Sequence, residues 1–377
     1  MAWIRSTTPG NSRRIWGNRN DVKRGEKLLA LLILAIAPFA FSGCVSSVLA
    51  TIAIKAPNQQ QVPAAVRDKR YAELFDALYS QTFRVPVGPP QAELAVAVIE
   101  PGNYHFNYAV ELRHTPNRWN WLEPKFEWTL PDRSNGAAVV SAKGTLLILH
   151  GYRDAKENIA HWALCLAEAG YRCVLVDLRG HGRSTGDSIG FGAFETHDLA
   201  RVLDELQKKG LASERVGLLG VSYGASMGLL LAAKDQRVGA VVALEPFSDA
   251  AKAVVEFAHG VAPQQAAKIS DRDFASAVEK AARRGKFSWS DGDVLAAMKN
   301  VSVPVLFYHG AKDRWLSPDN SRILQAAAKG PSRLVILDDD DHISLSMRLG
   351  SIAPEVRDWF DRYLAVTPAP ALSRAGP

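Results

Sequence analysis

The sequence predicts an α/β protein built on a mostly parallel central sheet with helices on both faces. Six runs of strand-forming residues after Thr145 are apolar over most of their length, which is typical of strands buried on both faces. Segments with helical spacing lie between most of these runs, and strands that alternate with helices form parallel sheets. With 47% hydrophobic and 22% charged residues, a chain of 377 residues is long enough to bury a large core.

The elements can be placed in chain order. Residues Arg67–Gln81 have the spacing of a short amphipathic helix. From Leu94 to Leu130, aromatic and β-branched runs separated by Pro, Gly and Asn predict antiparallel strands and hairpins. The six buried strands follow in "TLLILH", "RCVLVDL", "RVGLLGVS", "VGAVVALE", "VPVLFYHG" and "RLVILD". Helices are expected at Asn158–Ala169, Phe194–Lys209, Ser226–Lys234 and Ser321–Ala328. The helix-rich segment 247–298 interrupts this alternation and predicts a small helical cap.

The first 43 residues have the layout of a secretion signal. Residues 1–27 hold seven basic and two acidic side chains, residues 28–43 are uncharged and mainly apolar, and small residues precede Cys44. Residues 1–43 therefore account for +5 of the formal charge of +6, which leaves +1 from Cys44 onward. That balance excludes a broad basic surface for nucleic acid, so no nucleic-acid partner is expected.

The tetrapeptide "FSGC" resembles the lipobox of bacterial lipoproteins, in which the cysteine becomes the lipidated first residue of the mature chain. The resemblance implies lipidation of Cys44 and an exported, membrane-anchored domain, with residues 44–66 as a tether. An alternative stays open, because the apolar stretch continues to Ile54 and is long enough to span a bilayer as an uncleaved anchor. In either case the basic N-terminal side stays in the cytoplasm and the rest of the chain is exported.

The stretch "RVGLLGVSYGASMGLLLAAK" places a serine where a buried strand turns into a helix. Residues Gly220 to Gly224 fit the pattern G-x-S-x-G. A nucleophile at such a turn needs a strained backbone that projects its hydroxyl above the sheet, and flanking glycines let the strand and the helix approach each other. The N-terminus of the helix offers N–H groups to a developing oxyanion. These features predict that Ser222 is a catalytic nucleophile.

With these flanks the sequence resembles the α/β-hydrolase family from about Thr145 to Leu364, together with the preceding strands. The resemblance implies an α/β-hydrolase domain at residues 67–365, with the cap inserted at about 247–298 and a flexible tail at 366–377. "LILHGYRDA" resembles the family loop in which the residue after His-Gly donates a backbone N–H to the oxyanion hole. This implies an oxyanion hole made by the backbone N–H groups of Tyr152 and Tyr223.

A serine hydroxyl needs a base, and the base needs an orienting acid. The family places them in the order serine, acid, histidine, each after a strand. "VPVLFYHGAKDRWLSP" offers Asp313 as the acid, and "RLVILDDDDHISL" offers His342 as the base. Four competing groups are expected to have structural roles: His150 beside the oxyanion loop, His181 in a turn, His309 in packing or capping, and Asp338 to Asp341 in a solvated loop.

These residues predict a serine hydrolase that works through an acyl-enzyme. Within the family the motif set resembles that of carboxylesterases and small-ester hydrolases, which implies a small-molecule carboxylic ester as the substrate. Two alternatives stay open, an aminopeptidase or amidase of the same fold and a catalytically silent binding lipoprotein. No cofactor or metal is expected, because the remaining histidines have no metal-binding spacing. Cys165 and Cys173 are expected to be buried thiols rather than a disulfide. Five aromatic residues of the cap could line an apolar pocket or simply pack: Phe247, Phe257, Phe274, Phe287 and Trp289.

Overall fold

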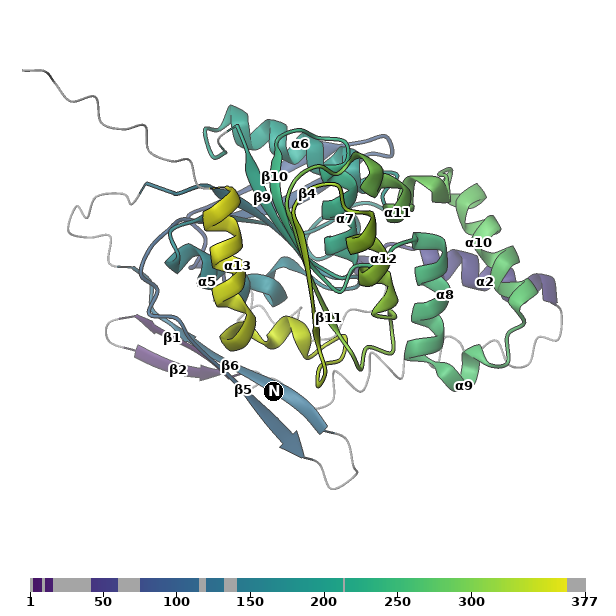
Figure 1. Ribbon diagram of the computed structural model, residues 1–377, viewed down its shortest axis with the longest axis horizontal. Helices are drawn as coiled ribbons and strands as arrows, with labels where there is room; N and C mark the ends of the chain where they lie inside the picture. Colours follow the sequence, from purple (N-terminus) through teal and green to yellow (C-terminus); the bar gives the residue numbers. More distant parts are fainter. Residues whose placement is uncertain are drawn as a thin grey trace, which may run out of the picture.

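The computed structural model describes residues 3–8, 11–15, 42–59, 75–114, 120–131, 141–212 and 214–364 (Figure 1). Within these ranges the chain forms an eight-stranded central sheet and a separate four-stranded sheet. The strand order of the central sheet is β12-β11-β10-β9-β7-β8-β4-β3. The predicted tail at 366–377 lies outside the described residues.

The parallel part of the central sheet contains the six strands that the sequence predicts, and that prediction is confirmed. They are β7 (Thr145–Leu149), β8 (Arg172–Val176), β9 (Val216–Val221), β10 (Val238–Leu244), β11 (Val305–Gly310) and β12 (Ser332–Leu337). β7, β10 and β11 are buried along their whole length. β12 is only partly buried, because it is the edge strand of the sheet.

The opposite edge of the central sheet is antiparallel. β3 (Gln81–Val87) pairs with β4 (Ala92–Ile99), and β4 pairs antiparallel with β8. The sequence prediction was wrong at Gln81, where β3 begins in place of the end of a helix. The earlier residues of that expected helix, 67–74, lie outside the described ranges.

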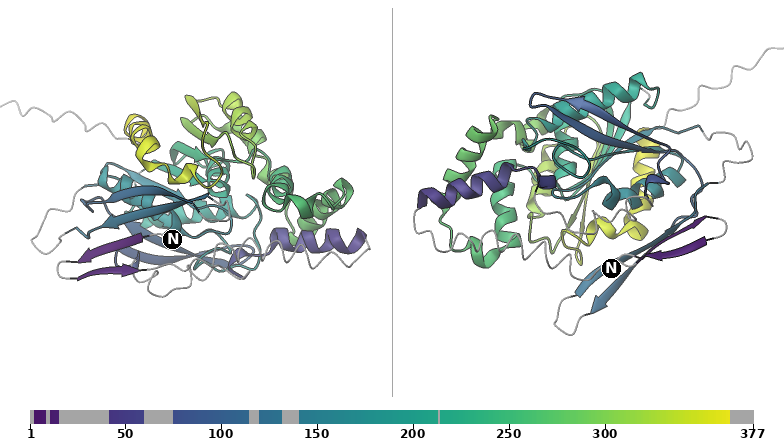
Figure 2. Two further views of the ribbon diagram at one scale, coloured as in Figure 1. Left: turned by 90° about the horizontal axis from the view of Figure 1, so that it is seen from below. Right: turned by 180° about the vertical axis from the view of Figure 1, so that it is seen from behind.

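A second sheet has the order β2-β1-β6-β5 and lies beside the central one (Figure 2). β5 (Asn107–His114) and β6 (Asn120–Trp128) form the antiparallel hairpin expected before residue 130. β1 (Trp3–Thr8) pairs parallel with β6, and β2 (Asn11–Ile15) pairs antiparallel with β1. These two strands belong to the segment that the sequence predicts to be a secretion signal. Residues 16–41 of that segment lie outside the described ranges.

Helices cover both faces of the central sheet, as the alternating buried strands predict. β7 shows the two faces: Leu146 and Ile148 belong to one core cluster, and Leu147 and Leu149 belong to the other. This follows from the two-residue period of a strand. The first cluster includes residues of α5 (Ala160–Glu168) and α13 (Leu349–Tyr363). The second includes residues of α6 (Glu195–Lys208), α7 (Tyr223–Ala232) and α12 (Asp319–Ala327).

The segment between β10 and β11 is helical, as predicted for the cap. It contains α8 (Ala250–Val261), α9 (Pro263–Ala266), α10 (Asp271–Gly285) and α11 (Val294–Ala297). Two side chains mark helix starts: Asp249 accepts the N–H of Lys252 at 3.1 Å, and Ser270 accepts the N–H of Asp273 at 3.1 Å. Such N-caps satisfy backbone donors that the first helical turn leaves free.

Helix α2 (Ser42–Ile54) packs along α10 of the cap (Figure 2). Ala50 and Ile54 form a small core with Ala281, and Arg284 donates to Thr51 Oγ1 at 2.7 Å. The expected tether at 44–66 is therefore helical and docked in its first part, because its small and apolar residues cover the apolar side of α10. Among the helices in the described ranges, none has the length and hydropathy needed to cross a bilayer.

Candidate active site

Ser222 lies at the sharp turn between β9 and α7, as predicted. Its backbone has φ 52° and ψ −113°, a region that residues with a side chain rarely adopt. The turn is held on both sides, because Ser222 N–H donates to Leu244 O at 2.7 Å and Ser226 N–H donates to Ser222 O at 3.1 Å. Such strain costs about 1–3 kcal/mol and persists only where the surrounding structure enforces it.

The glycines on either side of the serine let the strand and the helix approach each other. A Cβ atom added to Gly220 would lie 2.5 Å from the backbone of Gly224 and Ala225. One added to Gly224 would lie 2.5 Å from the carbonyl oxygens of Leu149 and His150. Both contacts are with backbone, which cannot move aside as a flexible side chain would. The G-x-S-x-G spacing is therefore required by the packing of this turn.

The structure brings Ser222, His342 and Asp313 together in one hydrogen-bonded row. His342 lies in the loop after β12, and its Nε2 is 2.9 Å from Ser222 Oγ. Asp313 lies in the loop after β11, and its Oδ2 is 2.6 Å from His342 Nδ1. A carboxylate oxygen beside Nδ1 fixes the proton on that nitrogen, so Nε2 can accept the proton of the serine hydroxyl.

Asp313 is held as an anion by its hydrogen bonds. Burial raises its pKa, but hydrogen bonds from His309 and His342 outweigh burial, and the pKa lies well below the usual range. Its other oxygen accepts the backbone N–H groups of Trp315 at 2.8 Å and Leu316 at 2.9 Å. The carboxylate is therefore ionised and fixed in orientation at neutral pH.

His309 is a fully buried partner of Asp313 that sequence reasoning placed only in packing or capping. Its Nε2 lies 3.1 Å from both Asp313 Oδ2 and Leu316 O. Because both neighbours are acceptors, Nε2 carries the proton, and Nδ1 accepts the hydroxyl of Ser321 at 2.7 Å. The "FYHG" strand end was the available signal, since it places a histidine four residues before the acid.

The predicted oxyanion loop lies against the serine. A Cβ added to Gly151 would be 3.8 Å from Ser222 Cβ, which places Tyr152 next in the chain at this edge of the site. His150 holds the loop as expected: its Nε2 accepts Leu178 N–H at 3.0 Å, so its Nδ1 carries the proton and donates to Gly151 O at 2.8 Å. Tyr223 begins α7, where backbone N–H groups point out of the helix end. The oxyanion roles of Tyr152 and Tyr223 stay predictions.

His181 belongs to the turn after β8, as expected, and hydrogen-bonds within it. Its Nδ1 lies 2.7 Å from Arg179 O, and its ring packs beside those of His150, Tyr152 and Tyr223. Burial lowers the pKa of His181 to about 3, so the ring is neutral at physiological pH.

The run from Asp338 to Asp341 is less solvated than predicted. Asp340 is buried and accepts hydrogen bonds from Arg348 Nε and Ser344 Oγ, both at 2.7 Å. Asp341 accepts the N–H groups of Ile343 and Ser344, at 3.0 and 2.9 Å. These bonds shape the loop that carries the histidine. The expectation of a solvated loop was wrong at Asp340, because Arg348 in the following segment supplies a charged partner.

Aromatic side chains lead away from the histidine toward the cap. The ring of Trp315 lies 5.0 Å from that of His342, Phe257 of α8 lies 5.6 Å from Trp315, and Tyr152 lies 5.7 Å from Phe257. All three aromatic residues are half-buried. Of the five cap aromatics considered for a pocket, Phe257 takes part in this row. Phe287 and Trp289 pack on each other and on Phe194 and Phe191, which favours a core role for them.

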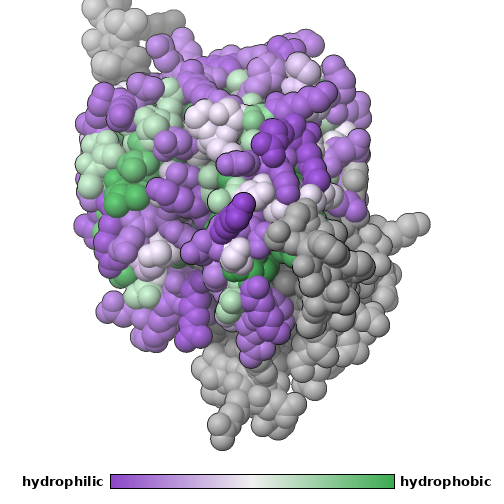
Figure 3. Space-filling model, turned by 90° about the vertical axis from the view of Figure 1, so that its right-hand side faces the viewer, coloured by the Kyte–Doolittle hydropathy of each residue, from purple (hydrophilic) through white to green (hydrophobic). Residues whose placement is uncertain are grey.

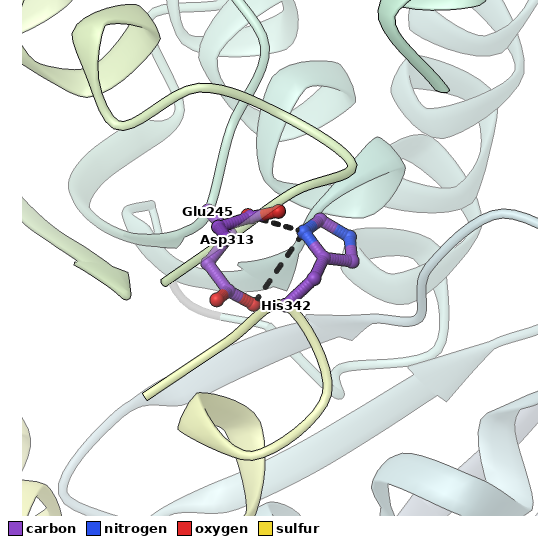
Figure 4. A group of neighbouring side chains, drawn as sticks. All are labelled: Glu245, Asp313 and His342. Carbon is purple, nitrogen blue, oxygen red and sulfur yellow. Dashed lines mark hydrogen bonds and ion pairs between the residues drawn. The ribbon is translucent and has the colours of Figure 1, made fainter. Parts of the chain in front are cut away.

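Glu245 is a further residue of the site that the sequence analysis missed. It follows β10 directly, is fully buried, and has φ 55°. Its Oε2 lies 4.0 Å from His342 Nδ1, and Figure 4 shows its carboxylate and that of Asp313 both directed toward the imidazole. Glu245, Asp313 and His342 each offer a ligand atom within 4.8 Å of the others, so they could hold a cation. A metal at Nδ1 would have to displace the hydrogen bond to Asp313.

Cys165 and Cys173 are buried free thiols, as predicted. Cys165 Sγ lies 2.9 Å from an Nη atom of Arg357. Burial raises the pKa of both thiols, so neither is a reactive thiolate at neutral pH.

Comparison with known proteins agrees with this geometry. The family model for the α/β hydrolase fold matches residues 144–290. YqkD of Bacillus subtilis, an uncharacterized protein, is 27% identical over 202 residues, which cover 52% of this chain and 64% of that protein. This chain therefore aligns with just under two thirds of the length of that relative.

Two solved structures show the same fold. An esterase from Pyrococcus furiosus superposes with a TM-score of 0.52 at 15% identity, covering 77% of this chain and 95% of its own. An acylaminoacyl peptidase from Pyrococcus horikoshii superposes with a TM-score of 0.51 at 16% identity, covering 80% of this chain and 44% of its own. The chain therefore has the α/β-hydrolase fold.

Proposed function

We propose that this hydrolase cleaves carboxylic esters through a covalent acyl-enzyme on Ser222. The observation that carries the proposal is the row of two hydrogen bonds, 2.9 Å from Ser222 Oγ to His342 Nε2 and 2.6 Å from His342 Nδ1 to Asp313 Oδ2. Acyl transfer requires a nucleophile, a base and an orienting acid. The site provides them as a serine on the strained strand-to-helix turn, a histidine and an ionised carboxylate.

The reaction follows from the proton positions. His342 Nε2 takes the hydroxyl proton as Ser222 Oγ attacks the acyl carbonyl, and the imidazolium that forms is stabilised by the Asp313 carboxylate. The imidazolium then gives the proton to the leaving alkoxide, which departs as an alcohol. A water molecule, deprotonated by the same nitrogen, attacks the acyl-enzyme and releases the acid. The backbone N–H groups of Tyr152 and Tyr223 are proposed to bind the oxyanion in both steps.

The leaving group of the substrate is either an alcohol or an amine, because an esterase and a peptidase share this fold. We propose an ester with an apolar acyl group, since Trp315 and Phe257 place aromatic surface beside His342. An acyl chain on that surface would remove apolar area from water at about 25 cal/mol per Å². Amide hydrolysis is the second candidate.

A rate series separates these candidates. Wild-type protein would be given p-nitrophenyl esters from acetate to palmitate and an aminoacyl p-nitroanilide, with turnover by the Ser222→Ala variant subtracted. We expect serine-dependent ester turnover with a chain-length optimum and little anilide cleavage. Turnover of the anilide alone would move the assignment to the peptidases. If the folded protein turns over none of these substrates, the alternative of a lipoprotein that binds without catalysis is favoured.

We further propose that the protein is exported and anchored to the membrane through lipidated Cys44. The charge and hydropathy of residues 1–43 support this, and α2 carries Cys44 in its first turn while lying along the cap. The coloured part of the cap side of the molecule is mostly hydrophilic, with one apolar patch at its left edge and smaller apolar areas elsewhere (Figure 3). Attachment is therefore expected to depend on the N-terminal segment rather than on the cap surface.

The anchoring proposal is tested by the Cys44→Ser variant expressed with its leader intact. A lipoprotein is expected to lose its acyl mass and to shift from the membrane to the soluble fraction, while Ser47→Ala, as a matched change on the same helix, stays in the membrane. Unchanged membrane retention without any acyl mass on wild-type protein would contradict lipidation and favour an uncleaved anchor.

A further inference from the structure

Glu245 is a buried carboxyl group for which the catalytic row has no assigned use. It stands directly after β10, and its N–H donates to Tyr308 O of β11 at 2.8 Å. Its side chain is fully buried, and neither carboxyl oxygen makes a hydrogen bond of good geometry in the described part of the chain, where the backbone N–H of Gly310 is the donor that acts on it. Buried polar groups are nearly always hydrogen-bonded, so a buried carboxyl group whose oxygens are not satisfied in this way needs an explanation.

Its surroundings favour the neutral form of this carboxyl. Burial raises the pKa of Glu245 well above the usual range, and the carboxylates of Asp313, Asp341 and Asp340 raise it further. The backbone N–H of Gly310 acts in the opposite sense and is the smallest of these influences. While Asp313 is ionised beside it, Glu245 is therefore expected to keep its proton.

Geometry places Glu245 within reach of the nitrogen that Asp313 holds. β10 and β11 are adjacent parallel strands, with Leu244 in register with Tyr308, so residues that follow the two strands meet at one edge of the sheet. Oε2 of Glu245 is 4.0 Å from His342 Nδ1, whereas Oδ2 of Asp313 is 2.6 Å away. A side-chain shift of roughly 1 Å would bring Oε2 into hydrogen-bond range.

We propose that Glu245 is a positioning residue, a second carboxyl that accepts a hydrogen bond from the Nδ1–H of His342 when Asp313 does not. The inference rests on the proposed hydrolase function and deepens it, because it gives the histidine two possible orienting acids. When Asp313 is replaced by a smaller residue, the charge that raises the Glu245 pKa most is removed, and the space it leaves beside Nδ1 admits water, which weakens the effect of burial, the largest cause of the raised pKa. Glu245 then gives its proton to that water, and its carboxylate accepts the Nδ1–H hydrogen bond, which holds His342 in the tautomer that leaves Nε2 free to act as a base.

Two replacements of Asp313 distinguish this role from a simple loss of the acid. Asp313→Ala vacates the position beside Nδ1, so Glu245 can move in. Asp313→Asn places an amide N–H₂ group there, which favours the wrong tautomer and blocks Glu245. We expect the Ala variant to keep a kcat about ten-fold or more above that of the Asn variant. Equal kcat values in the two variants would contradict the proposal.

The double variant Asp313→Ala/Glu245→Gln tests the residue itself. Its kcat is expected to fall about ten-fold or more below that of Asp313→Ala, because the neutral Gln amide lacks the negative charge that stabilises the imidazolium and its N–H₂ group favours the wrong tautomer. The matched control is Asp313→Ala/Asp339→Asn, which removes one carboxylate at a fully exposed position and is expected to match Asp313→Ala. A double variant as active as Asp313→Ala overturns the proposal. If the Ala variants do not fold, the same pair is built on Asp313→Ser.

A measurement without turnover keeps this test separate from the proposed function. The Nδ1 proton of a histidine bonded to a carboxylate resonates far downfield in proton NMR, and ¹⁵N-histidine labelling identifies it. We expect this signal in wild-type protein and in Asp313→Ala, and its loss in Asp313→Ala/Glu245→Gln. If wild-type protein shows this resonance but cleaves no substrate, the proposed function is contradicted, and the role of Glu245 can still be tested by comparing the resonance in the variants. A signal that is absent from Asp313→Ala contradicts the role of Glu245.

Discussion

The Ser222→Ala variant is expected to hydrolyse its preferred ester about 10,000-fold or more slowly than wild-type protein. Alanine cannot form the acyl-enzyme, so catalysis is limited to what the oxyanion donors and substrate binding supply to direct attack by water. The KM is expected to change much less than kcat, because the hydroxyl contributes to the transition state rather than to ground-state binding.

The measurement is a steady-state rate for both proteins with the best p-nitrophenyl ester of the series. Thermal unfolding controls for folding, and the two midpoints are expected to agree, since the serine side chain contacts His342 without filling a core position. Ester turnover in Ser222→Ala within ten-fold of wild type would show that another group is the nucleophile.

Replacing Gly224 by alanine is expected to destabilise the fold by about 4 kcal/mol or more. The added methyl group would lie 2.5 Å from the carbonyl oxygens of Leu149 and His150, and both are backbone atoms of the central sheet or the loop after it. Relief of this contact requires α7 to move away from β7. That movement would also displace Ser222 from His342, so activity should fall with stability.

The matched control is Gly228→Ala, one turn further along the same helix. A Cβ there would lie 3.6 Å from a methyl group of Leu218, which is ordinary packing distance. Alanine within a helix is more favourable than glycine by about 0.8–1 kcal/mol, so this variant is expected to be as stable as wild type or more stable. Denaturant unfolding measures both free energies. A Gly224→Ala protein as stable as Gly228→Ala would contradict the tight approach at the elbow.

The elements nearest the site were the most predictable from sequence, for a physical reason. Parallel strands buried on both faces must be apolar over most of their length. For this reason the position of each strand around Ser222 could be predicted from its own apolar run. The Ser222 elbow was predictable because its backbone demands glycine on both sides. The roles of Asp313 and His342 were predictable because each residue comes shortly after a strand, and the carboxyl ends of parallel strands lie at the same edge of the sheet.

The parts that could not be predicted depend on contacts between segments far apart in sequence. "ALEPF" contains no motif, and Glu245 joins the site only because β10 and β11 are neighbours. The second hydrogen bond on Asp313 comes from a histidine that sequence alone could not orient. The docking of α2 depends on an apolar side of α10 that is more than two hundred residues away in the chain.

The most direct test of the acyl-enzyme account is the mass of the protein after treatment with a fluorophosphonate, which phosphonylates an activated serine. We expect one adduct per molecule, located at Ser222 by peptide mapping, and no adduct on the Ser222→Ala variant or on wild-type protein unfolded before treatment. An adduct on another residue, or folded wild-type protein that stays unmodified, would contradict it.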